Sequence, residues 1–171
     1  MDPLIKDLQI GLIRYFQAEK SASALVLGIG GVAIVASFFL WRSGGVWKPM
    51  IWPLLGVAVI QLVVGASVYW RTDRQIADLT AKLQRSPQVF AAEEISRMTA
   101  VMRSFPIYRG IQIVLLVVGA ALALFFRDHW NAGWPAVGAG LMIQAGVMLL
   151  FDFYAERRGE LYLEAVRRLL V

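Results

Sequence analysis

Four long stretches of the sequence are almost free of charge, and charged segments separate them. They lie at residues 21–41, 50–70, 107–126 and 132–153. An α-helix rises about 1.5 Å per residue, so each stretch is long enough to cross the roughly 30 Å hydrocarbon core of a bilayer. A chain that is 58% hydrophobic leaves too little polar sequence to cover four such helices in water. We therefore predict an all-α integral membrane protein, a four-helix bundle of transmembrane helices.

The first charged segment, residues 1–20, has an amphipathic pattern. Its apolar residues recur at helical spacing and share one face: Leu4, Leu8, Leu12, Tyr15 and Phe16. This pattern is typical of a helix that lies in the membrane interface, or of one that packs on the central loop.

The other two charged segments also predict helices. Residues 71–106 form a helical loop in which Ser86-Pro87 ends one helix and Pro106 separates a second helix from the third span. Residues 154–171 form a helical tail. We therefore expect helical extensions outside the bilayer.

The distribution of basic residues predicts the topology. With four spans, both termini and the central loop lie on one side, and of the 17 basic residues only Arg42, Lys48 and Arg127 fall on the other. The positive-inside rule then places both termini in the cytoplasm. We therefore attribute the net charge of +5 to basic residues that orient the chain in the membrane and attract anionic lipid. We expect no nucleic-acid partner.

Two phrases of the sequence resemble each other. "WPLLGVAVIQLVVG" begins at Trp52 and "WPAVGAGLMIQAG" begins at Trp134. With a one-residue slip, the phrases align Gly56 with Gly138, Gln61 with Gln144, Asp73 with Glu156, and Arg74 with Arg157. The preceding segments agree more loosely, as in "LIRYF" and "VMRSF". The pattern favours a tandem duplication of a helical hairpin over chance matching of apolar sequence, and the two copies would run parallel to each other.

Polar residues inside the spans are the first candidates for function. An unpaired amide in hydrocarbon costs several kcal/mol, so Gln61 and Gln144 should face protein. We expect a hydrogen bond between them, contributing about 0.6 to 2 kcal/mol; a pore or substrate contact is the alternative. Asp152 ends the fourth span at the level of Arg71 and Arg74, which predicts a boundary ion pair, with a proton relay as the alternative.

Two further sets of residues are candidates for helix contacts. With the glutamines, the candidate binding or contact residues are Asp152, Arg71, Asp73, Arg74, Glu156 and Arg157. Small residues let helix backbones approach closely, within the bundle or between protomers. The candidates of this kind are Gly28, Gly31, Gly56, Gly119, Gly138 and Gly140.

The sequence offers little for catalysis. It has no cysteine and a single histidine, His129, which follows the third span beside Asp128. It contains no HExxH motif, nucleophile elbow or phosphate-binding loop. We therefore expect no enzyme activity, no metal site and no cofactor.

Three segments carry a family resemblance: "IQLVVGASVYWRTDRQ", "EEISRMTAVMRSFPIYRG" and "GLMIQAGVMLLFDFYAERRGELY". On these, residues 52–162 resemble a family of small four-span bacterial inner-membrane proteins. The resemblance implies that location and no settled activity. It runs through Gln61, Arg71, Thr72, Asp73, Gln75, Arg97, Met98, Met102, Tyr108, Gln144, Asp152, Glu156, Arg157 and Tyr162. Gln112 stands where the family pattern has an acid, so the resemblance transfers no charge role to that position.

These observations favour a non-catalytic protein that acts by protein–protein contact in the bilayer. The best hypothesis is an immunity protein whose partner is a membrane-active, pore-forming toxin. The alternative is an oligomeric ion channel or small transporter subunit, in which Gln61, Gln144 and Asp152 line a path between protomers of a homo-oligomer. A membrane sensor is a third option.

Overall fold

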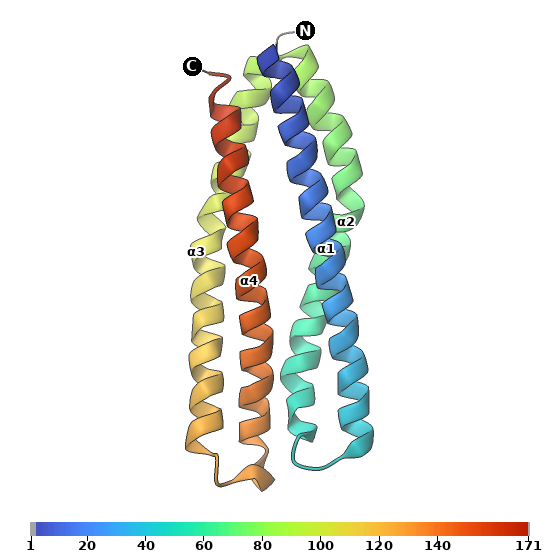
Figure 1. Ribbon diagram of the computed structural model, residues 1–171, viewed down its shortest axis with the longest axis vertical. Coiled ribbons are helices and arrows are strands. Elements are labelled where there is room, and N and C mark those ends of the chain that lie inside the picture. Colours follow the sequence, from blue (N-terminus) through green and yellow to red (C-terminus); the bar gives the residue numbers. More distant parts are fainter. Residues whose placement is uncertain (1–2, 171) are drawn as a thin grey trace.

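The computed structural model describes residues 3–170, and four long helices dominate it (Figure 1). They are α1 (Pro3–Ser43), α2 (Ile51–Arg85), α3 (Pro87–Phe125) and α4 (Trp134–Arg167). Short 3-10 turns, η1 (Lys48–Met50) and η2 (Trp130–Ala132), precede α2 and α4. The described residues contain no strand, and the predicted all-α four-helix bundle is confirmed. Residues 1–2 and 171, which belong to the predicted N-terminal segment and tail, lie outside the described residues.

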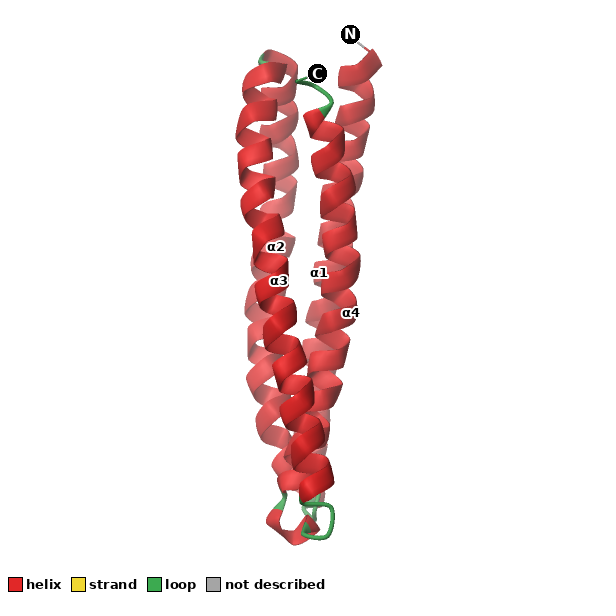
Figure 2. Cartoon of the chain, turned by 90° about the vertical axis from the view of Figure 1, so that its left-hand side faces the viewer, coloured by secondary structure: helices red, strands yellow, loops and turns green. Residues whose placement is uncertain are grey.

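The helices pair as two hairpins. α1 packs mainly on α2, and α3 packs mainly on α4. The hairpins stand side by side, and both chain ends lie at the same end of the bundle as the α2–α3 connection (Figure 1). A view turned by 90° shows an elongated bundle whose helices all run along its long axis (Figure 2). This arrangement agrees with the pair of hairpins expected from the repeat.

Each of the four helices is long and apolar enough to cross a membrane, so the chain is by length and composition a multi-pass membrane protein. The helices have 34 to 41 residues, whereas about 20 residues cross the hydrocarbon core. Each one therefore continues for roughly 20 Å or more beyond the apolar stretch. We call residues 21–70 and 107–153 the apolar half, and residues 3–20, 71–106 and 154–170 the charged half.

One predicted helix boundary is wrong and one is confirmed. Residues 3–20 continue without a break into the first span, because α1 is continuous. Pro106 does not separate two helices; it lies inside α3. A proline there removes one backbone hydrogen bond, a loss that the packing of α3 on either side outweighs. The predicted break at Ser86-Pro87 is confirmed, since α2 ends at Arg85 and Ser86 has φ −150° and ψ 79°.

The two halves of the bundle have different cores. Large apolar side chains fill the charged half, where burial removes them from water. They include Leu8, Leu12, Phe16, Leu83, Phe90, Met98, Tyr162, Leu163 and Val166. The amphipathic segment thus packs on the central loop and on α4, the second of the two alternatives its pattern left open.

In the apolar half the buried positions are mostly small or polar. They include Ser23, Gly30, Ala33, Ser37, Ala58, Gln61, Gly119, Ala136, Gly138, Gly140, Gln144 and Ala145. Large side chains such as Val32, Phe39 and Val117 are exposed instead. Lipid is as apolar as leucine, so these helices associate through close backbone packing and hydrogen bonds.

Candidate functional site

The two glutamines of the repeat meet in the interior of the apolar half. Gln61 Nε2 on α2 donates a hydrogen bond to Gln144 Oε1 on α4, at 3.1 Å. The same nitrogen lies 3.4 Å from the sulfur of Met148. Gln61 is 1% exposed and Gln144 is 3% exposed. The predicted hydrogen bond is therefore present, and it joins the two hairpins in the buried interior of the apolar half.

A lateral groove opens beside this pair, between α1 and α4. Its volume is about 590 Å³. Its walls are largely aliphatic, and the polar residues that line it are Ser43 and Gln144. The lining residues are Ile29, Val32, Ala33, Ala36, Phe39, Leu40 and Ser43 of α1, Met50, Leu54, and Ile143, Gln144 and Val147 of α4. Because Val32 and Phe39 are exposed, the groove opens on the outer surface of the apolar half.

Gln144 is one of the two polar residues that line this groove. Its Oε1 accepts from Gln61, whereas its Nε2 makes no hydrogen bond within residues 3–170. Within residues 3–170, Oε1 of Gln61 is buried without a partner. Such groups are costly in hydrocarbon, so a bound molecule with a polar atom at this depth would satisfy one of them.

Three of the six predicted glycine contacts form inside the bundle. A Cβ on Gly119 would lie 2.7 Å from the carbonyl oxygen of Gly138, so α3 and α4 touch backbone to backbone at these two glycines. Gly140 packs on Pro53 and Met50, which places α4 against the start of α2. These are the close contacts that small residues allow.

The other three glycines do not form contacts within the bundle. Gly28, Gly31 and Gly56 have no atom within 4 Å of an added Cβ, so the within-bundle interpretation is wrong for them. Gly30 instead packs on α2, where an added Cβ would lie 3.3 Å from the carbonyl oxygen of Ala58. One residue turns a helix by about 100°, so a shift of a single position moves a glycine off the contact face.

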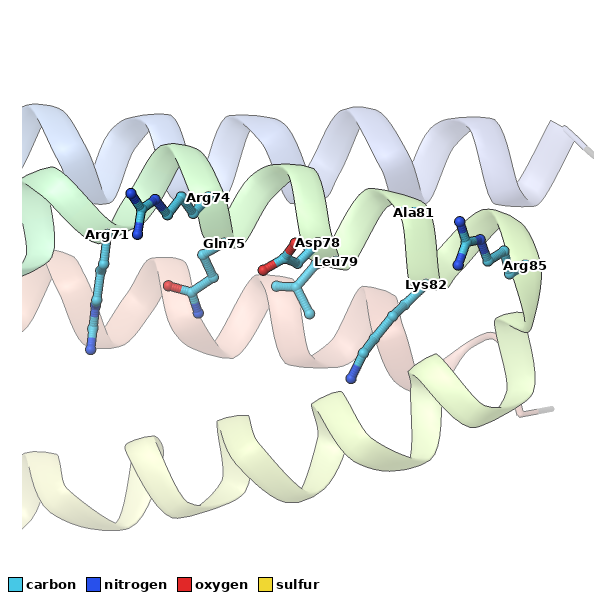
Figure 3. Close-up of a pocket in the computed structure, with 8 residues that line it drawn as sticks. All are labelled: Arg71, Arg74, Gln75, Asp78, Leu79, Ala81, Lys82 and Arg85. Carbon is cyan, nitrogen blue, oxygen red and sulfur yellow. The ribbon is translucent and has the colours of Figure 1, made fainter.

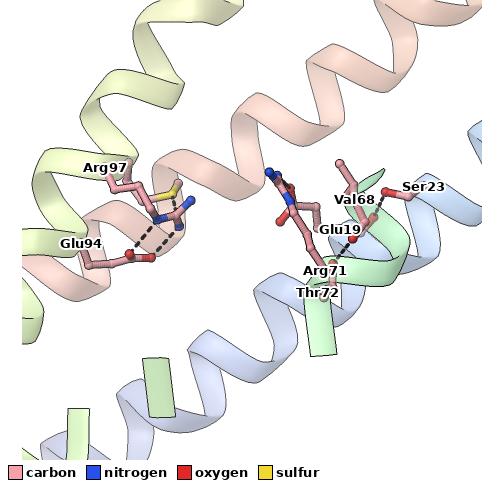
Figure 4. Close-up of polar contacts among 8 residues, drawn as sticks. Glu19, Ser23, Val68, Arg71, Thr72, Glu94 and Arg97 are labelled. Atoms are coloured by element: carbon pink, nitrogen blue, oxygen red, sulfur yellow. Dashed lines mark hydrogen bonds and ion pairs between the residues drawn. The ribbon is translucent and has the colours of Figure 1, made fainter. Parts of the chain in front are cut away.

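The ion pair expected between Asp152 and Arg71 or Arg74 does not form. Asp152 accepts a hydrogen bond from Nε2 of Gln112, on the neighbouring helix of its own hairpin. Arg71 lies 3.9 Å from a carboxylate oxygen of Glu19 on α1 (Figure 4). Arg74 makes no ion pair among the described residues. The prediction failed because it matched depth alone, whereas these residues point toward different neighbours.

Two ion pairs instead follow the repeat. Lys20 of α1 bonds Asp73 of α2 at 2.6 Å, and Arg109 of α3 bonds Glu156 of α4. The alignment already matches Asp73 with Glu156, and the offset that matches "LIRYF" with "VMRSF" also matches Lys20 with Arg109. Equivalent residues thus make equivalent contacts in the two hairpins, which supports the duplication.

The charged half contains a buried polar cluster that the sequence patterns did not single out. Glu94 on α3 is 2% exposed. Arg97 donates two hydrogen bonds to its carboxylate, at 2.8 and 2.6 Å (Figure 4). The hydroxyl of Tyr162 on α4 donates a third, at 3.0 Å. The sequence could have indicated that Glu94 is buried, because it lies four residues from both Phe90 and Met98, on the apolar face of its helix.

Aromatic rings from α1 close this cluster. The Tyr15 ring stacks on that of Tyr162 with centroids 4.5 Å apart, and the Arg97 guanidinium lies 5.5 Å from the centroid of Phe16. Burial raises the pKa of Tyr15 to about 12. Burial and the nearby Glu94 carboxylate also raise the pKa of Tyr162, so both phenols are neutral near pH 7. The cluster joins three helices and serves as a structural tie.

The remaining features give no evidence of a catalytic or metal centre. Within residues 3–170, no group of three or more metal-ligating side chains comes together. Comparison with protein-family models, curated proteins and solved structures found no match to this chain. The family resemblance therefore stays a prediction, and the lateral groove with Gln144 is the best-defined candidate site.

Proposed function

We propose that this chain is a non-catalytic protein of a bacterial inner membrane, which acts by binding another membrane protein within the bilayer. In its most specific form, the proposal is an immunity protein that neutralises a pore-forming toxin. Both termini would lie in the cytoplasm, as the distribution of basic residues predicts.

The lateral groove between α1 and α4 is the observation that carries this proposal. It opens sideways, so a partner can enter it from the lipid without crossing the bundle. Its aliphatic walls suit the side chains of a transmembrane helix, and the free Nε2 of Gln144 offers that helix one hydrogen bond. A toxin helix held here would be kept from assembling into a pore.

The channel hypothesis has less support. It needs Gln61, Gln144 and Asp152 on a surface shared by protomers. The glutamines bond each other inside one chain, and Asp152 bonds Gln112 of its own hairpin. The sensor hypothesis draws support from the helices that run unbroken from the apolar half into the charged half. The pocket at the opposite end of the bundle, between Gly45 and Gly133, has a volume of only about 240 Å³.

The test is a protection assay in bacteria that express the chain together with each secreted toxin encoded beside its gene. Ala36→Phe fills the groove, and Val117→Phe adds the same ring at an exposed position of α3 outside it. We expect the wild type and Val117→Phe to preserve the membrane potential of toxin-treated cells, and Ala36→Phe to lose this protection.

Two results would refute the proposal. Equal protection by both variants would show that the groove is not the contact. Failure of the wild type to protect against any neighbouring toxin, together with conductance in reconstituted bilayers, would favour the channel hypothesis.

A further inference from the structure

A second groove lies in the charged half, along α2; Arg71 and Lys82 point toward α3, whereas Arg74 and Arg85 extend to the other side of the helix (Figure 3). Its volume is about 740 Å³. The residues that line it come from α2: Arg71, Arg74, Gln75, Asp78, Leu79, Ala81, Lys82 and Arg85. Four of these side chains are cations and one is a carboxylate, so the groove is strongly basic.

The positive charge of this groove is only partly neutralised. Lys82 pairs with Glu93 at 2.7 Å, and Arg71 has a longer contact of 3.9 Å with Glu19. Arg74 and Arg85 make no hydrogen bond or ion pair within residues 3–170. A guanidinium without a protein partner is available to an anion, and its planar donors suit phosphate oxygens.

One end of the groove lies at the expected depth of lipid headgroups. The apolar stretch of α2 ends at Trp70, which is 75% exposed, as is typical of a residue in the aromatic belt. Arg71 follows it directly, and Arg74 lies one turn further along. Arg85 is about 16 Å beyond Arg74 along the helix, out of reach of a lipid that stays in the bilayer.

The equivalent region of the second hairpin is different. The repeat matches Arg74 with Arg157, but it places Tyr154 where the first hairpin has Arg71. The small groove beside Arg157 is also lined by Glu156 and Glu160. An excess of positive charge at the membrane boundary is thus a property of the α2 groove and not of both hairpins.

We propose that the membrane end of this groove, formed by Arg71, Arg74 and Gln75, binds the phosphate of an anionic phospholipid headgroup. The Arg74 guanidinium, which has no protein partner within residues 3–170, contacts the phosphate, and Arg71 and the Gln75 amide, on the side of α2 toward α3, donate to the rest of the headgroup (Figure 3). The site does not depend on the lateral groove, which lies in the other half of the bundle.

Three matched variants test this site: Arg74→Gln, Arg157→Gln and Arg85→Gln. Each removes one exposed arginine that has no protein partner, so the net charge changes equally. Native mass spectrometry of the full chain in detergent measures the binding of phosphatidylglycerol relative to phosphatidylcholine. We expect the wild type to prefer phosphatidylglycerol, and Arg74→Gln to lower that preference about fivefold. Arg157→Gln and Arg85→Gln should leave it unchanged.

Several outcomes would overturn the inference. A wild type without preference for phosphatidylglycerol would remove the site, and an equal loss in Arg157→Gln would show only general surface charge. Displacement of the lipid by inorganic pyrophosphate, with an equal loss in Arg85→Gln, would indicate a soluble anion instead. Circular dichroism of each variant checks that it is folded. Arg74→Gln should still protect cells from the toxin, because the lipid site and the lateral groove lie in different halves of the bundle.

Discussion

Replacing Glu94 with alanine tests the energetic role of the buried cluster. The change leaves Arg97 without its carboxylate and Tyr162 without an acceptor. Breaking a buried ion pair costs about 3–5 kcal/mol, but water reaches Arg97, whose side chain is 35% exposed, and lowers that figure. The lost tyrosine hydrogen bond adds about 1 kcal/mol. We therefore expect a loss of about 3 kcal/mol.

The neighbouring residue provides the control. Glu93 pairs with Lys82, and the two side chains are 58% and 57% exposed. An exposed pair of this kind contributes about 0–1 kcal/mol, so Glu93→Ala should have a small effect. The two variants remove the same atoms and the same charge from adjacent positions. Burial is the main difference between them.

Thermal unfolding of the full chain in detergent, followed by near-ultraviolet circular dichroism, measures both effects. For a chain of this size, about 3 kcal/mol corresponds to a fall in Tm of roughly 6–12 °C. Glu93→Ala should lower Tm by less than about 4 °C. Equal shifts in the two variants would refute the argument. A double replacement of Glu94 and Arg97 by leucine should cost less than Glu94→Leu alone, because no charge is left unpaired.

Three further predictions concern other parts of the bundle. Gly119→Ala should destabilise the α3–α4 contact by about 1–3 kcal/mol, since its Cβ would lie 2.7 Å from the Gly138 carbonyl oxygen. Gly28→Ala is the control: open space surrounds this glycine, so its replacement should not lower Tm. An equal fall in Tm in both variants would contradict the packing. Gln61→Leu should cost about 0.6–2 kcal/mol by removing the hydrogen bond to Gln144, and a calorimetric change near zero would show that the pair contributes no stability. The raised pKa of Tyr15 means that the folded state favours the protonated phenol, so this stabilisation is complete below about pH 10 and is lost as pH rises toward about 12. Tyr15→Phe should therefore unfold with a shallower dependence on pH in that range, and an unchanged slope in chemical denaturation would argue against burial of the ring.

Several features of this protein could be predicted from local sequence. The four helices follow from apolar length, because backbone groups in hydrocarbon must bond within their own segment. The break at Ser86-Pro87 follows from the restriction that proline places on the preceding residue. The Gln61–Gln144 hydrogen bond follows from their similar depth and from the cost of an unpaired amide in lipid.

Other features were decided only by the tertiary structure. The direction in which each helix face points determines that Gly30 packs on α2 while Gly31 does not, and that Asp152 bonds Gln112 instead of an arginine on α2. Apolar length specifies how deep a residue lies, whereas its partner depends on the rotation of two helices about their axes. The tertiary structure also decides that α3 continues through Pro106. Its packing contacts on both sides of the proline outweigh one missing backbone hydrogen bond, and those contacts come from distant parts of the chain.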